Sequence, residues 1–254
     1  MNLDQITPVI LTYNERENIS RTMNALHWAK QIIIIDSFSS DETLEIVGKY
    51  QDVTVYQREF DTHENQWNYG LDKVKTEWVL SLDADYLVTE KLFREMEKID
   101  PTKADGFLIP FKYCVNGKPL RSTVLPPRIT LFRKDKAKYV NDGHTQRLRI
   151  KGDTPLLENH ILHDDRKPLS RWLWAQDRYM KLEVEKLFSG KKLSWPDRIR
   201  KKIFLAPILI FFYCLFFKRG LLDGKRGWYY AYQRMLAECL LSLRIIEYRF
   251  GKRD

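Results

Sequence analysis

The chain has 254 residues and a mass of 30.4 kDa, enough for one sizeable domain with an appendage. A hydrophobic fraction of 44% with only 11 glycines and 10 prolines excludes disordered, collagen-like and low-complexity proteins. Three cysteines without Cys-x-x-Cys or Cys/His spacing argue against a disulfide framework or a zinc site. The first residues lack the charged-then-apolar layout of a signal peptide, so we expect a cytoplasmic protein.

The net charge of +9 is concentrated near the C-terminus. Residues 191–254 hold fifteen Lys and Arg against five acids, and they contain an uncharged apolar run at residues 203–217. A bilayer span needs about 20 apolar residues, and Pro207 disfavours a straight helix. Cationic flanks around this run predict a region that lies on, or dips into, an anionic membrane face. The alternatives are a buried helix or a dimer contact, and nucleic acid is a poorer partner because no polar basic groove is indicated.

The first hundred residues alternate between strand and helix patterns. Short apolar runs rich in β-branched residues predict four buried strands, at residues 6–13, 31–36, 53–57 and 78–82. Asn14 and Ser39 are each followed three residues later by an acid, as in a capping box, so helices are expected to begin there. Further helices are expected over residues 66–74 and from Thr89. This alternation predicts an α/β fold, a mostly parallel sheet with helices on both faces.

The pattern changes after residue 100. Residues 107–115 and 120–123 flank Asn116-Gly117, a strong hairpin signal. Short strands are expected at residues 129–133 and 147–150, and helices at residues 170–188 and 228–250. We therefore predict a catalytic domain over residues 1–190, with a nucleotide-binding half (1–100) and an acceptor half (101–190). A helical membrane-associating region follows at residues 191–254.

Three polar clusters follow the predicted strands: residues 12–14, residues 36–41, and Asp83 with Asp85. Ligands of open parallel sheets bind at the carboxyl ends of the strands. Two carboxylates one residue apart suit a hard divalent cation and its diphosphate, provided that the backbone turns out of the strand. The alternative is that Asp85 caps the next helix while Asp83 is solvated.

Four segments in order, TPVILTYNERENI, IIIIDSFSSDET, QWNYGL and WVLSLDADY, resemble family 2 glycosyltransferases of the GT-A fold over residues 6–100. A weaker similarity continues through PPRITLFRKDKAKYV, GHTQ, His163 and GLLDGKRG. These segments are similar to bacterial enzymes that glycosylate the inner core of lipopolysaccharide and related glycans. The resemblance implies a Rossmann-like GT-A domain, a UDP-sugar donor, a Mg²⁺ or Mn²⁺ ion and inverting transfer.

The resemblance also implies roles for residues at the first two clusters. Thr12, Tyr13 and Asn14 would line the nucleotide pocket. Asp36 would accept a hydrogen bond from the uracil imide, for which a carboxylate is suited. Two residues of QWNYGL would lie near the ribose and the diphosphate, namely Gln66 and Asn68.

The third cluster would hold the metal. Asp83 would contact the ribose or the metal, and Asp85 would bind the metal directly. His163 could complete the metal shell or be a structural histidine, and His144 could face the donor sugar or diphosphate. A divalent ion there would stabilise the charge that develops on the departing diphosphate.

The acceptor hydroxyl needs a general base on the opposite face of the sugar. Relatives often carry His-Glu where this chain has His144-Thr145, so the base is expected at Asp164 or Asp165, with Asp142 in reserve. Alternatively, one of the two adjacent aspartates pairs with Arg166.

We therefore expect a transferase that is peripheral on the inner face of the cell membrane and acts on a lipid-linked or lipopolysaccharide-core saccharide. A sugar-nucleotide pyrophosphorylase is one alternative, but the glycine-rich loop that it needs is absent from TYNERENIS. A non-catalytic membrane scaffold is another. It is suggested by Phe38 in place of a family glycine, and by Tyr86 and Thr145 in place of family glutamates.

Overall fold

The computed structural model describes residues 1–142, 145–190 and 193–251, which form two compact units. The first unit consists of Met1–Gly117, Leu125–Asn141 and Gln146–Arg166. The second consists of Lys118–Val124, Asp142–Thr145 and Lys167–Asp254. Apart from His144 and the reserve base Asp142, every candidate site residue belongs to the first unit, and the division at residue 190 stays a prediction.

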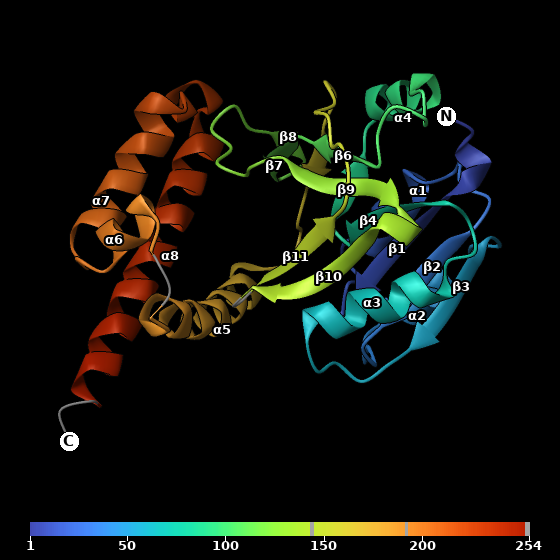
Figure 1. The fold of residues 1–254 in the computed structure, drawn as a ribbon. Coiled ribbons are helices and arrows are strands. Elements are labelled where there is room, and N and C mark those ends of the chain that lie inside the picture. The colour runs from blue at the N-terminus through green and yellow to red at the C-terminus, as the bar shows by residue number, and fades with distance from the viewer. Residues whose placement is uncertain (143–144, 191–192, 252–254) are drawn as a thin grey trace. The chain divides into compact units, whose positions relative to one another are not determined.

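A six-stranded sheet, ordered β3-β2-β1-β4-β9-β6, forms the centre of the first unit (Figure 1). Its strands are β1 (Ile6–Thr12), β2 (Ile32–Asp36), β3 (Val53–Gln57), β4 (Trp78–Asp83), β6 (Gly106–Ile109) and β9 (Arg128–Arg133). The first four strands of this order are parallel, as the apolar runs predict. β9 runs antiparallel to β4, and β6 runs antiparallel to β9.

Alternate residues of the buried strands supply two hydrophobic cores, one on each face of the sheet. Val9, Ile33 and Val79 pack with Trp67 and Leu71 of α3 (His63–Lys73). The strand residues between them, Ile10, Ile34 and Leu80, face the other side of the sheet. They pack in one cluster with Met23 of α1 (Ile19–Asn24) and Leu92 of α4 (Glu90–Lys98). The strands therefore read as continuous apolar runs because both faces are covered.

Two of the expected helix starts are not found in the structure. Thr62 and Thr89 cap α3 and α4 through hydrogen bonds to backbone nitrogens three residues on. The expected helix starts at Asn14 and Ser39 are wrong, because α1 begins at Ile19 and α2 spans Thr43–Val47. Instead, the Asn14 side-chain oxygen accepts from Ser40 N, and the Ser39 hydroxyl accepts from Asn14 N, so both side chains join the loops that follow β1 and β2.

Short strands complete the first unit. β5 (Tyr86–Val88), β12 (Ile161–His163) and β7 (Phe111–Val115) lie side by side in that order. β10 (Ala137–Asp142) pairs with β11 (Thr145–Ile150). Asn116 and Gly117 have φ angles of 49° and 73°, as a tight hairpin turn requires, and β8 (Lys118–Pro119), which follows them in the chain, is assigned to the second unit. The strand expected at residues 120–123 is wrong. Two 3₁₀ turns also occur, η1 (Leu3–Gln5) and η2 (Lys134–Lys136).

The second unit is helical. It contains α5 (Leu169–Phe188), α6 (Trp195–Arg200), α7 (Leu205–Phe212), the π-helix η3 (Tyr213–Phe217), the 3₁₀ turn η4 (Gly220–Asp223) and α8 (Lys225–Phe250). A small core joins α5 to α8 through Val184, Leu187, Leu241 and Ile245. Arg200 bridges Glu183 and Glu238 at 3.2 and 2.9 Å. Within the described residues, no helix has both the length and the apolar character that a membrane span requires.

Candidate active site

A buried carboxylate joins the carboxyl ends of β1 and β2. Thr12 and Asp36 are register partners, and Thr12 Oγ1 donates to Asp36 Oδ1 at 3.0 Å. Ser39 donates to the same carboxylate from its backbone nitrogen and from its hydroxyl, at 2.9 and 2.5 Å. Asp36 is completely buried, so its oxygens bond within the chain as buried polar groups must. Its contact with a uracil imide stays a prediction, and such a contact requires one of these bonds to open.

Two residues beside this carboxylate have left-handed backbones. Asn14 has a φ of 55°, and its side-chain oxygen accepts from Ser40 N at 2.8 Å. Phe38 has a φ of 58° and is 55% exposed, and Tyr13 is also exposed. A left-handed residue other than glycine costs on the order of 1–3 kcal/mol, which the surrounding bonds must offset. The loops after β1 and β2 thus present two aromatic rings to solvent at the edge where nucleotides bind in such sheets.

Gln66 and Asn68 lie on α3 and bond to backbone segments of the same unit. Gln66 is buried and donates to Ser37 Oγ at 2.9 Å, while its side-chain oxygen accepts from Arg58. Asn68 donates to Tyr139 O and accepts from Tyr139 N, both at 3.0 Å. Their amide groups hold α3 to the loop after β2 and to β10, and their predicted contacts with a ribose or diphosphate stay predictions.

Asp83, the last residue of β4, lies beside a buried tyrosine and an arginine. The phenol of Tyr86 donates to Asp83 and accepts from Arg128 Nη1 at 3.1 Å. Burial raises the pKa of Tyr86, and the negative charge of Asp83 raises it further. The phenol therefore stays protonated and can hold both side chains in position. Tyr86, which replaces the family glutamate, is thus part of the site.

Asp85 and His163 are in direct contact. His163 Nε2 lies 3.0 Å from Asp85 Oδ2, because β12 pairs with β5 so that His163 faces Tyr86. Burial lowers the pKa of His163, but the charges of Asp85, Asp83 and Asp165 outweigh it and raise that pKa. His163 Nδ1 is buried and has no hydrogen-bond partner within the described residues. The sequence-predicted ligands Asp85 and His163 are therefore brought together, with Asp83 close enough to act on the imidazole.

This pair fits a divalent ion. The 3.0 Å contact between His163 Nε2 and Asp85 Oδ2 is a hydrogen bond, and an octahedral ion with ligands at about 2.1 Å, whose neighbouring ligand atoms lie about 3 Å apart, would take the place of the proton in it. Among the described residues, no three His, Cys, Asp or Glu side chains surround a common point where an ion could sit. The protein would thus supply two ligands, with Asp83 beside them, and a substrate diphosphate or water would supply the others.

The two candidate bases differ in their surroundings. Asp164 is 2% exposed and accepts from Arg21 Nη1 at 2.6 Å, from Arg166 Nε and Nη2 at 2.9 Å, and from Gly117 N at 3.2 Å. Asp165 is partly exposed and accepts from Asn18 Nδ2 at 2.9 Å. The expected pairing of one aspartate with Arg166 thus occurs at Asp164.

Arg128 is a site residue that the sequence patterns did not single out. It opens β9, which runs antiparallel to β4, so its strand starts where β4 ends. The only sequence signal is a basic residue at the start of an apolar strand, and its place depends on a strand direction that periodicity does not reveal. His144 and the side chain of Asp142 lie outside the described residues.

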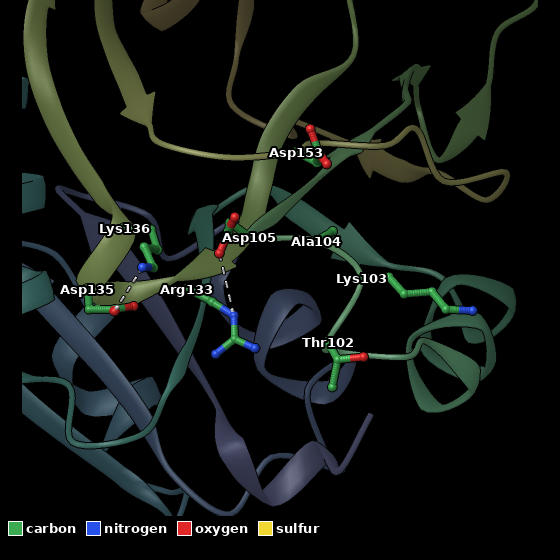
Figure 2. Close-up of a pocket in the computed structure, with 8 residues that line it drawn as sticks. All are labelled: Thr102, Lys103, Ala104, Asp105, Arg133, Asp135, Lys136 and Asp153. Carbon is green, nitrogen blue, oxygen red and sulfur yellow. Dashed lines mark ion pairs between the residues drawn. The ribbon is translucent and has the colours of Figure 1, made fainter.

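A separate pocket of about 440 Å³ lies at the opposite end of β4 (Figure 2). Asp105 and Arg133 form one of its ion pairs, at 3.8 Å, and Arg133 pairs with Trp78 at the start of β4. Asp83 is five residues further along the strand, about 16 Å away at the usual rise. The pocket is therefore distinct from the cluster around Asp85.

Comparisons with known proteins agree with this geometry. The sequence profile of the family described as "Glycosyl transferase family 2" matches residues 7–151. The Staphylococcus aureus poly(ribitol-phosphate) beta-N-acetylglucosaminyltransferase TarS is 29% identical over 141 residues, covering 49% of this chain and 24% of TarS. The S. aureus poly-beta-1,6-N-acetyl-D-glucosamine synthase is 34% identical over 96 residues, covering 35% of this chain and 23% of the synthase.

Among solved structures, the mannosyltransferase PcManGT from Pyrobaculum calidifontis, in complex with GDP-Man and Mn²⁺, has a TM-score of 0.55 at 10% identity. The alignment covers 95% of this chain and 87% of PcManGT. The chain spans about a quarter of the length of the curated relatives that it matches. Its α/β fold is the GT-A fold, and the profile covers more than half of its residues. The chain therefore belongs to glycosyl transferase family 2.

Proposed function

We propose that this protein is an inverting, metal-dependent glycosyltransferase that moves a sugar from a UDP-sugar to a saccharide. The observation that carries the proposal is the contact of Asp85 with His163 beside Asp83, at the carboxyl end of β4. Two curated relatives are named for N-acetylglucosamine transfer or polymer synthesis, which supports glycosyl transfer. UDP as the donor nucleotide rests on the family resemblance of the segments around Thr12 and Asp36.

Asp85 and His163 would hold the Mn²⁺ or Mg²⁺ ion, with Asp83 beside it. When bound, the ion supplies positive charge to the diphosphate that leaves the sugar. Arg128, held by Tyr86, would add a second positive charge near the same oxygens. Tyr13 and Phe38 would face the nucleotide from the loops after β1 and β2.

In the transfer step, an acceptor hydroxyl oxygen forms a bond to the anomeric carbon while the bond from that carbon to the diphosphate oxygen breaks. The hydroxyl attacks from the face of the sugar opposite the diphosphate, which inverts the configuration at the anomeric carbon. Its proton passes to a carboxylate on that face. We assign that carboxylate to Asp165. The alternative, Asp164, already accepts four hydrogen bonds, from Arg21, from Arg166 and from Gly117 N.

The acceptor would be a lipid-linked or lipopolysaccharide-core saccharide, and the protein would be peripheral on the inner face of the cell membrane. The apolar run at residues 203–217 with basic flanks supports this location. The C-terminal similarity to lipopolysaccharide-core enzymes supports the acceptor class.

The test is UDP release from a panel of UDP-sugars, with and without Mn²⁺, in the wild type and in Asp85→Ala. The variant is expected to lose the metal-dependent release by at least about 100-fold, because the cation is no longer held at the diphosphate. Metal-dependent tightening of UDP binding, measured by calorimetry, is expected to disappear with it.

Asp135→Ala is the matched control, because Asp135 is an exposed carboxylate of the same unit in the pocket at the other end of β4. It is expected to behave as the wild type does. Full metal-dependent release in Asp85→Ala would remove the metal site. A wild type that prefers GDP to UDP in the calorimeter would overturn the assigned donor.

A further inference from the structure

The segment formed by α7 and the π-helix η3 exposes its largest apolar side chains. Exposed residues recur in adjacent pairs every four positions, at 204–205, 208–209, 212–213 and 216–217. The side chains turned toward the rest of the unit are Ala206, Pro207, Cys214 and Leu215. Phe204 is 76% exposed and Phe217 is 77% exposed. We call the four exposed pairs the apolar ridge.

This arrangement is the reverse of an ordinary surface helix, which turns charged and polar residues to water. A helix that is apolar on every side is normally covered by protein or by lipid. Here the inner face packs against the described chain, and the outer face remains open to solvent. A contiguous apolar surface of this kind marks an interaction site.

The charges at the two ends of the ridge are nearly all positive. Residues 198–226 contain eight Lys and Arg and a single acid, Asp223. The carboxylate of Asp223 accepts from the backbone nitrogens of Arg121 and Ser122, at 3.0 and 3.1 Å. Lys202 lies just before the ridge and Arg219 just after it, and both are exposed. A partner therefore meets apolar surface between two positive ends.

Aromatic residues of α8 extend the ridge at its side. α7 and α8 pack against each other (Figure 1). Phe211 contacts Trp228 and Tyr232, with ring centroids 6.0 and 5.2 Å apart. Trp228 and Tyr232 are 41% and 51% exposed. Trp and Tyr with one face buried and one open are typical of the boundary between lipid chains and headgroups.

We propose that the apolar ridge binds an anionic lipid surface and lies in its plane. The thirteen residues of α7 and η3 are about 20 Å long at a helical rise, against about 30 Å for a hydrocarbon core. The ridge would enter the region just below the headgroups, with Lys202 and Arg219 at the level of the lipid phosphates. The ridge is thus the surface through which the protein would reach the proposed membrane location. Its binding to lipid does not depend on the transferase activity.

A second copy of the chain fits the ridge less well. Both ends of the ridge are positive, so either direction of pairing between two ridges brings like charges together. An anionic bilayer supplies both the apolar layer and the opposite charge.

The test is co-sedimentation with phosphatidylcholine vesicles, with and without phosphatidylglycerol. The wild type is expected to bind the anionic vesicles, and rising salt is expected to weaken this binding. Phe216→Ser/Phe217→Ser should reduce the partition coefficient at least about tenfold, since two large apolar side chains no longer enter the lipid. Lys218→Glu/Arg219→Glu should weaken binding to anionic vesicles while leaving any binding to neutral vesicles unchanged.

Phe60→Ser/Leu156→Ser is the matched control, because it removes two exposed apolar side chains from the first unit. It should bind as the wild type does, and circular dichroism should show all variants folded. Equal binding by the ridge variant and the wild type would overturn the proposal. The proposal would also be overturned if the wild type formed a concentration-dependent dimer that the ridge variant abolishes and did not bind vesicles. Asp85→Ala should still bind vesicles, so a failed transferase assignment is distinguishable from a failed lipid assignment.

Discussion

Asp164 and Asp165 are adjacent in the sequence but differ in what they can do. Asp164 is buried among donors from Arg21, Arg166 and Gly117, which occupy its oxygens and leave it little access to a substrate. Asp165 keeps a partly exposed carboxylate, oriented by Asn18. These contacts support our proposal of a structural role for Asp164 and a chemical role for Asp165.

Substituting each aspartate with asparagine separates the two roles. Asp164→Asn is expected to lower the free energy of unfolding by about 2 kcal/mol, because it leaves two guanidinium groups without their counter-charge. Asp165→Asn is expected to leave thermal stability unchanged and to lower kcat by at least about 100-fold, as the loss of a general base does. Thermal melts and UDP release measure the two effects. The assignment of the base to Asp165 fails if its variant turns over normally.

The packing of α3 on the sheet depends on a glycine. A Cβ built on Gly70 would lie 2.8 Å from Val9 Cγ1 and 3.2 Å from Ile35 Cγ1, both on buried strands. The helix can approach β1 and β2 closely because no side chain stands between them. Gln66 and Asn68 lie on the same helix, so this contact also holds the amide groups that bond to the loop after β2 and to β10.

Gly70→Ala is expected to destabilise the first unit by about 1–3 kcal/mol, because the new methyl group overpacks the core between α3 and the sheet. Gly48→Ala is the control, since its nearest atom would be a backbone oxygen at 3.4 Å, an ordinary contact. Chemical denaturation of both variants gives the comparison. Equal stability of the two would contradict the packing that we describe.

The sequence predicts the strands that are buried on both faces and does poorly with the short ones. The central strands β1, β2 and β4 are mostly apolar, and each was expected within one residue of its bounds. β5 and β12 have three residues each and no periodicity of their own, so they form through their pairing with each other and of β12 with β7. The same limit applies to Asn14 and Ser39, whose side chains fit a helix cap but bond across loops instead.

The same limit decides which parts of the candidate site could be predicted from the sequence. Asp83 and Asp85 follow a recognisable strand, so their place was predictable from the chain itself. The contact of Asp85 with His163 crosses 78 positions and requires β12 to lie beside β5. Arg128 requires in addition that β9 runs antiparallel to β4, and no local pattern encodes that direction.

The two units have independent hydrophobic cores. The first has apolar clusters on both faces of the sheet, and the second has the α5–α8 cluster with the Arg200 ion pairs. The candidate donor and metal residues that the structure describes belong to the first unit, and the apolar ridge belongs to the second. Ligands of the two units should therefore act on different parts of the protein.

Differential scanning calorimetry is expected to resolve two unfolding transitions. UDP with Mn²⁺ should raise only one of them, by about 2.7 kcal/mol of apparent stability at one hundred times the dissociation constant. Gly70→Ala should lower that same transition and leave the other in place, which assigns it to the first unit. A single transition that UDP and Gly70→Ala shift as a whole would show that the units unfold together.

The reversed direction of β9 also bears on how the chain tolerates insertions. Trp78 pairs with Arg133 and Leu80 with Leu131. If this register is continued along both strands, Arg128 lies opposite Asp83. One residue added inside β9 would shift the register by one position and turn the guanidinium of Arg128 to the other face of the sheet. The connection before β9 is irregular, but Asp223 and Tyr230 accept hydrogen bonds from the backbone of Arg121, Ser122 and Val124 within it, so its length can change at little cost only at the exposed residues 126–127. Homologous chains can therefore differ in length just ahead of this arginine, but the spacing from Arg128 to Arg133 must stay the same.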